Sequence, residues 1–99
     1  MSRRVIFTPL AGVEFDDAVA WYGARSRRTS NRFIAGVMRL RNLIAENPLQ
    51  YAPIQDGARR AVVHGFPYVL IYRISGDEVH VVARFHTSRN PRAWRRRLR

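Results

Sequence analysis

A set of basic side chains in the second half of the chain could do chemistry on an anion. Alternation along runs that are typical of strands predicts one open sheet face, or its edges, for Arg59, Arg60, Arg73, His80, Arg84, His86 and Arg89. Guanidinium groups form charge-assisted, often paired hydrogen bonds with phosphate and carboxylate. This face is therefore predicted to bind one of these anions. For His86, a purely structural role in hydrogen bonding at a strand end is an open alternative.

A second basic group ends the chain and forms an arginine-rich tail over about residues 88–99. Its arginines are Arg89, Arg92, Arg95, Arg96, Arg97 and Arg99. Trp94 stands among them, and we expect it either to pin the tail onto the domain or to anchor a contact with a partner. Clustering of this kind favours a binding role for the tail.

The positive charge of the chain comes from arginine alone, because the sequence contains no lysine. The formal net charge is +11 and the sequence pI is about 11.7. Such a surface favours acidic partners, either nucleic acid or an acidic protein segment. A codon-biased genome that favours arginine on a soluble surface is the plainer explanation. The absence of lysine excludes a lysine base or Schiff base.

Several kinds of active site are excluded or unsupported by the sequence. The chain has no cysteine, which excludes a disulfide framework, a thiolate zinc site and a cysteine nucleophile. No catalytic triad, carboxylate pair or glycine-rich phosphate loop is evident, and the three histidines are scattered. We expect no metal and no cofactor, and the residues make no strong case for an enzyme.

The length and composition of the chain predict one small folded domain over residues 1–99. The hydrophobic content of 46% is enough for a core, although so short a chain is expected to be only modestly stable. Nothing resembles a signal peptide, and no run approaches the roughly 20 apolar residues that span a bilayer. We expect a cytoplasmic protein that does not enter a membrane.

Apolar spacing predicts two amphipathic helices in a hairpin. The first begins at Thr8-Pro9, where threonine can cap and proline is tolerated, and runs to about Arg27. The second covers about residues 31–46, with Thr29-Ser30 as its cap. The two buried faces are expected to hold Ala11, Phe15, Ala18 and Tyr22, and then Phe33, Val37, Leu40 and Ile44.

Strands are predicted at residues 4–7, 59–64, 68–75 and 78–87, with a loop over 49–57. Gly76-Asp77 is a strong signal for a hairpin turn. On the last strand, alternation predicts that the helices are met by Val79, Val81, Ala83 and Phe85. The order β-α-α-β-β-β gives an α+β fold in which the helical hairpin packs on a small, mainly antiparallel sheet.

The order of these groups resembles the RelE/ParE superfamily of toxins from toxin–antitoxin pairs, with ParE as the nearer branch. The resemblance covers roughly residues 4–94. It rests on an ordered set of motifs: Phe7-Thr8-Pro9, Trp21-Tyr22, Arg59-Arg60, Phe66-Pro67-Tyr68, Tyr72-Arg73, Arg84-Phe85-His86, Arg89-Asn90-Pro91 and Trp94. The ordered set is more specific than any single motif in it.

The resemblance implies a bacterial toxin, encoded on a chromosome or a plasmid, that binds DNA gyrase and stabilises its cleaved-DNA complex. We expect the target contact to be made by Arg89, Arg92, Trp94, Arg95, Arg96 and Arg97. The resemblance also implies a cognate antitoxin, in a toxin–antitoxin hetero-oligomer. An acidic or amphipathic segment of that antitoxin is expected to pair with Arg73 and Arg84.

Two other functions remain open at this stage. The ribonuclease branch of the superfamily cleaves mRNA on the ribosome without a metal, and by resemblance Arg84 would stabilise the transition state while His86 moves protons. Arg59 and Arg60 would then replace lysines of that branch, but Pro67-Tyr68-Val69 stands where a catalytic arginine is expected. A plain nucleic-acid-binding domain is the other alternative, although no reader helix or aromatic stacking motif supports it.

Overall fold

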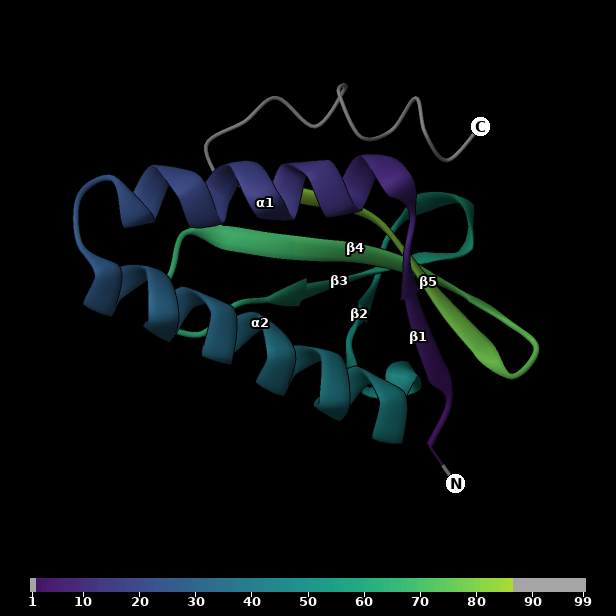
Figure 1. Cartoon of the computed structure of the whole chain (residues 1–99). Coiled ribbons are helices and arrows are strands. Elements are labelled where there is room, and N and C mark those ends of the chain that lie inside the picture. Colours follow the sequence, from purple (N-terminus) through teal and green to yellow (C-terminus); the bar gives the residue numbers. More distant parts are fainter. Residues whose placement is uncertain (1, 87–99) are drawn as a thin grey trace.

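The computed structural model describes the backbone of residues 2–86 and the side chains of residues 2–84. Two helices lie together on one face of a five-stranded sheet whose order is β1-β5-β4-β3-β2 (Figure 1). The elements are β1 (Arg4–Phe7), α1 (Pro9–Gly23), α2 (Arg27–Glu46), η1 (Pro48–Gln50), β2 (Ala52–Pro53), η2 (Gln55–Gly57), β3 (Ala58–Val62), β4 (Tyr68–Ser75) and β5 (Glu78–His86). This confirms the predicted α+β fold.

The starts of the two helices follow from short polar side chains. The Thr8 hydroxyl accepts a hydrogen bond from the Ala11 amide at 3.3 Å, and Pro9 takes the first helical position. Helix α2 begins earlier than predicted, because Ser26 is its cap and accepts from the Thr29 amide at 3.2 Å. The predicted cap at Thr29-Ser30 is therefore wrong. Ser30 is buried instead, and its hydroxyl donates to the Val19 carbonyl at 3.1 Å.

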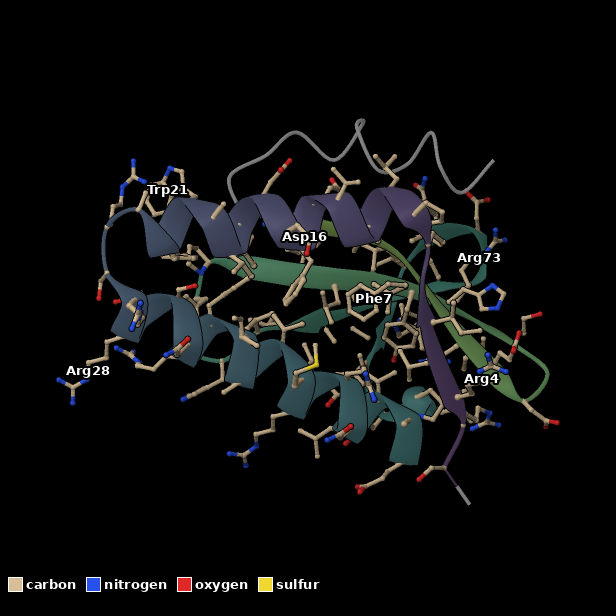
Figure 2. The ribbon with its side chains drawn as sticks, in the orientation of Figure 1. Arg4, Phe7, Asp16, Trp21, Arg28 and Arg73 are labelled. Atoms are coloured by element: carbon tan, nitrogen blue, oxygen red, sulfur yellow. The ribbon has the colours of Figure 1, made fainter. Side chains whose placement is uncertain are left out.

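The main core lies between the helices and the sheet, as the apolar spacing predicts. Helix α1 contributes Ala11 and Ala18, with Phe15 and Tyr22 packed beside them, while all four predicted residues of α2 are buried. Strand β1 adds Val5 and Phe7, and Figure 2 shows Phe7 pointing into the layer between helices and sheet. The core therefore fixes which face of the sheet stays clear of the helices, and that second face is called the open face below.

The sheet is antiparallel except where β1 runs parallel to β5. The turn between β4 and β5 contains Gly76 at φ +58°, a conformation that glycine adopts without strain. Strand β2 was not predicted, because two residues that include Pro53 carry no alternation signal. It pairs with Arg59 and Arg60 of β3 at the edge of the sheet.

An irregularity in the pairing of β4 with β5 reverses the faces of β5 near its end. Ile71 is opposite Ala83, but the next residue, Tyr72, is opposite Val81, so β5 holds one extra residue there. Val79 and Val81 meet the helices as predicted, whereas Ala83 packs on the open face with Val69 and Ile71. The predicted placement of Ala83 is thus wrong, and so is that of Arg84, because strict alternation does not pass through a bulge.

Candidate functional site

The open face of the sheet carries a short row of polar side chains on neighbouring strands. Arg60, Arg73 and His80 lie there, and Arg73 pairs in register with His80. The exposed Arg73 guanidinium donates to the Asp56 carbonyl at 2.8 Å. The His80 ring lies 3.1 Å from a carboxylate oxygen of Glu78. The row can attract an anion, although one of its members already faces a carboxylate.

Arg84 lies on the helix side of the sheet, beneath the middle of α1. Its Nε donates to the Glu14 carbonyl at 2.8 Å, and its guanidinium carbon lies 4.3 Å from the centre of the Tyr68 ring. A second nitrogen of the guanidinium, Nη1, is buried without a hydrogen-bond partner among the described residues. The arginine therefore joins β5 to α1 and β4 and does not project from the open face, which corrects its predicted location.

Arg59 also faces the helix side, where it holds the segment that follows α2. Its Nη1 donates to the carbonyls of Leu49 and Tyr51, at 3.2 and 2.7 Å. Sequence reasoning placed Arg59 at the edge of an anion site. The structure instead gives its guanidinium two backbone acceptors, so it is occupied in folding, and only Arg60 of the Arg59-Arg60 pair lies on the open face.

Tyr72 is the buried centre of this region and donates a hydrogen bond from its hydroxyl to the Pro48 carbonyl. Burial raises the pKa of Tyr72 to about 12, because a phenolate would lose its hydration. The Arg59 charge opposes that rise and Tyr51 adds to it. The buried, protonated hydroxyl ties β4 to the Pro48 carbonyl, in the segment that follows α2.

An aromatic cluster joins the helical hairpin to the start of β4. The Tyr22 and Phe33 ring centres are 5.2 Å apart, and Phe66 and Tyr68 pack against both. Burial first, and then the neighbouring Tyr68, raises the pKa of Tyr22. The predicted packing of Tyr22 and Phe33 on the buried faces of the helices is confirmed. The half-buried Tyr22 and Tyr68 therefore place their hydroxyls at the margin of the core.

Trp21 differs from the other aromatics, because 51% of it is exposed (Figure 2). The guanidinium carbon of Arg25 lies 3.6 Å from the centre of its ring, and that arginine also donates to the Trp21 carbonyl at 2.8 Å. An aromatic on an amphipathic helix is expected to pack in the core or between the helices, and Trp21 does so only in part. Its ring meets the Tyr22 ring edge-on, with the ring centres 5.1 Å apart.

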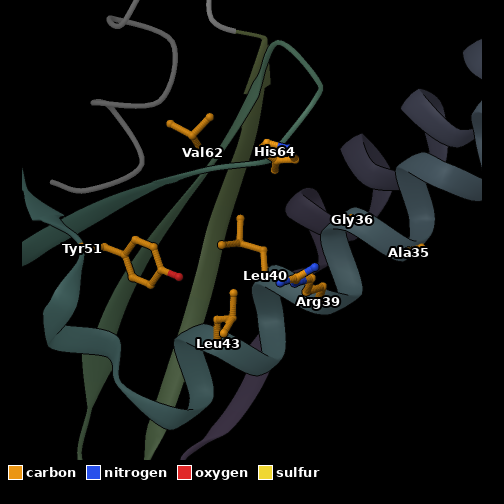
Figure 3. A pocket seen from close by; sticks show the side chains of 8 residues that line it. All are labelled: Ala35, Gly36, Arg39, Leu40, Leu43, Tyr51, Val62 and His64. Carbon is orange, nitrogen blue, oxygen red and sulfur yellow. The ribbon is translucent and has the colours of Figure 1, made fainter.

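A groove of about 560 Å³ lies between α2 and β3, and no sequence pattern predicted it. Its walls come from Ala35, Gly36, Arg39, Leu40 and Leu43 of α2, with Tyr51, Val62 and His64 opposite (Figure 3). Taken one at a time in the sequence, the residues that line the groove look like ordinary core or surface residues. The groove could be found from the sequence only by combining two features: the stripe of small and apolar residues on α2, and the packing of that stripe beside β3.

The predicted target-contact residues, Arg89 to Arg97 with Trp94, lie outside the described residues, as does the side chain of His86. Their roles stay predictions. Within residues 2–86, no group of three or more histidine, cysteine, aspartate or glutamate side chains could hold a metal ion. In the same range no helix is long and apolar enough to cross a membrane.

Comparison with known proteins supplies a family and a fold. The sequence model of the family described as "ParE toxin of type II toxin-antitoxin system, parDE" matches residues 5–91. A solved structure described as "Chromosomal ParDE TA system from P. aeruginosa" superimposes with a TM-score of 0.73 at 12% identity, over 86% of this chain and 96% of that chain. No curated protein matches the sequence. At that identity the structural likeness concerns the fold alone.

Proposed function

The chain belongs to the ParE toxin family of type II toxin–antitoxin systems, and from this premise we propose that it poisons DNA gyrase. In this account the toxin binds gyrase in the cytoplasm and stabilises the complex in which the DNA is cleaved. Replication then stops, and a cognate antitoxin prevents this by binding the free toxin. The toxin supplies binding energy and leaves bond breaking to gyrase.

The observation that carries the proposal is the match to the family over residues 5–91, which includes every described strand and helix of the core. Some basic residues that catalysis would need are engaged within the fold, which agrees with a toxin that acts by binding its target. Four residues were considered for ribonuclease chemistry. The guanidinium groups of two of them, Arg59 and Arg84, donate hydrogen bonds to backbone carbonyls. A phosphate on the open face would meet Arg60 and Arg73 without them.

The basic tail remains the proposed contact with gyrase and its DNA. Six arginines in the last eleven residues would be drawn to phosphate or to an acidic protein surface, and Trp94 would supply an apolar anchor. On the described surface, Arg73 is the exposed arginine that we retain as a contact for an acidic antitoxin segment. Arg84 lies beneath α1 and would reach a partner only if the helix moved.

A cleavage assay tests the proposal. Purified toxin is incubated with gyrase, supercoiled plasmid and ATP, and the DNA is scored after protease treatment. Linear plasmid that accumulates with toxin concentration is the expected result. Alanine at Arg89, Arg92, Trp94, Arg95, Arg96 and Arg97 should abolish it while the melting temperature stays near that of the parent chain. Intact plasmid at toxin levels that arrest growth would overturn the proposal.

A further inference from the structure

The end of the helical hairpin, where α1 turns into α2, concentrates positive charge. Four arginines stand there within eight residues, next to an exposed tryptophan. This surface is called the hairpin end below and consists of Trp21, Arg25, Arg27, Arg28 and Arg32. All five residues are exposed, and Figure 2 shows Trp21 and Arg28 at the end of the molecule where the two helices join. The site considered above, on the open face of the sheet, includes none of them.

No acidic side chain balances the charge of the hairpin end. Residues 18–45 contain six arginines and no aspartate or glutamate. Among the described residues, Glu78 pairs with Arg4 and with His80, and neither of these ion pairs includes an arginine of the hairpin end. Guanidinium groups keep their charge at any physiological pH. The hairpin end therefore presents a fixed positive charge to an anionic partner.

Folding gives no reason for two of these arginines. Arg27 and Arg28 occupy the first turn of α2, and that turn contains no acidic residue. The N-terminus of a helix is the positive end of its dipole, so cationic side chains are unfavourable there. Binding of an anion would offset this repulsion. The two arginines are thus better explained by a partner than by the stability of the helix.

The composition of the hairpin end favours a nucleic-acid backbone over a protein surface. Trp21 is the one large apolar side chain that is exposed between residues 21 and 32. The Arg25 guanidinium carbon lies 3.6 Å from the centre of its ring, so one face of the ring is already covered. A stable protein–protein interface has an apolar centre, which this surface lacks, whereas phosphate backbones are bound mainly by basic side chains. We propose that the hairpin end binds the phosphate backbone of the DNA that gyrase holds, an inference that rests on the proposed function.

The hairpin end lies at the end of the sheet from which the arginine-rich tail continues. Tyr22, the neighbour of Trp21, packs against Tyr68 with ring centres 6.2 Å apart, and Tyr68 pairs in register with His86. Arg89 follows His86 by three residues, so the length of the chain alone keeps it within about 11 Å. The residues already proposed to contact gyrase and its DNA therefore begin at the same end of the molecule. The two basic sets would bind neighbouring stretches of one duplex.

Salt titration of DNA binding by the free toxin gives the first test, with a fluorescent duplex as the probe. Each phosphate contact that is lost lowers the slope of log K against log salt by about 0.9. Arg27→Gln with Arg28→Gln should therefore lower the slope by about 2 and weaken binding at least about tenfold near 100 mM salt. The control, Arg39→Gln with Arg41→Gln, makes the same charge change at exposed positions of the same helix and should leave the slope unchanged.

The control pair decides between a local site and the charge of the whole chain. Equal losses in the two double variants would mean that the net charge of +11 drives binding wherever it lies, and would overturn the proposal. Misfolding would not imitate the expected result. Removing positive charge from the positive end of α2 should keep or raise the melting temperature, while DNA binding falls.

Cross-linking in the presence of gyrase identifies the partner. Because the chain has no cysteine, Ala24→Cys places a single thiol in the exposed turn between the helices, and Asn42→Cys places one on the far half of α2 as a control. Each variant is labelled with a photoactivatable cross-linker and added to gyrase, supercoiled plasmid and ATP. We expect cross-links to DNA from Ala24→Cys and none from Asn42→Cys. Cross-links to a gyrase subunit alone would assign the hairpin end to a protein surface and would overturn the proposal.

The outcomes separate this inference from the proposed function. If the parent toxin produces no linear plasmid, gyrase poisoning fails, and the salt titration alone decides whether the hairpin end binds DNA. If the parent poisons gyrase, Arg27→Gln with Arg28→Gln should need at least about tenfold more toxin for the same linear plasmid, and the control should not. Equal potency of the parent and this double variant would overturn the proposal while the proposed function stands.

Discussion

Two side chains of this toxin, Arg59 and Tyr72, hold the irregular segment that follows α2 against the sheet. Arg59 bonds two carbonyls of the segment after α2, and the buried Tyr72 hydroxyl bonds a third, that of Pro48. The Tyr72 contact is buried, and a buried polar group that loses its partner is costly, whereas the two Arg59 contacts are exposed or half-buried. The two residues thus position Tyr51, one wall of the groove.

Replacing Tyr72 by phenylalanine tests this arrangement. The Pro48 carbonyl would lose its donor, and we expect the free energy of unfolding at pH 7 to fall by about 1–3 kcal/mol. The pH dependence should change too. The folded chain keeps the phenol proton to about pH 12 and the unfolded chain releases it near the ordinary pKa of 10.0, so stability falls as pH rises between these values. Denaturant titrations across that range should show a shallower slope for Tyr72→Phe, and equal slopes would contradict the assignment.

Arg84 gives a prediction that separates binding from catalysis. Arg84→Met keeps an apolar stem against Tyr68 but loses the bond to the Glu14 carbonyl, so we expect a loss of about 1–3 kcal/mol in stability. At a temperature where the variant stays folded, gyrase poisoning should persist within a few-fold. A loss of activity by a factor of 100 or more from a folded variant, as expected for a catalytic group, would contradict this role.

The helices and long strands are predictable from the sequence because local periodicity specifies them. All four expected α2 core residues are buried, and the strand at 68–75 is found with its predicted bounds. The bulge in β5 is not predictable in this way. One extra residue is stabilised by the pairing of two whole strands, and its only local trace is Val82, which looks like any other strand residue. The same bulge moves Arg84 from the open face to the helix side.

Glycine in α1 offers a prediction about an element. A Cβ built on Gly12 meets no atom within 4 Å beyond its own helix backbone, so alanine fits there without a clash. Gly12→Ala should raise the free energy of unfolding by about 0.5–1 kcal/mol, because the unfolded chain loses conformational freedom. Gly76→Ala is the matched contrast, since its φ of +58° strains a side chain and the substitution should destabilise. Chemical denaturation of both variants decides it, and the opposite signs would refute the argument.

At the scale of the whole molecule, fold and charge are readable from the sequence but the groove is not. Two amphipathic helices before three strands allow few arrangements, and the net charge follows from composition alone. The groove depends on where β2 stops along β3 and on how closely α2 approaches at Gly36, and both are consequences of packing. Sequence reasoning therefore found the basic residues but assigned them to one face. In the structure Arg59 and Arg84 bond backbone carbonyls on the helix side, and Arg60 and Arg73 lie on the open face.

One paired measurement tests the central claim that this toxin acts on gyrase by binding. A single preparation of the toxin is added to gyrase with supercoiled plasmid and ATP, and in parallel to translating ribosomes with a defined mRNA. We predict linear plasmid after protease treatment in the first reaction, at toxin levels comparable with those of gyrase, and intact mRNA in the second. Cleaved mRNA together with normally supercoiled plasmid would contradict the account and would return Arg84 and His86 to a catalytic role.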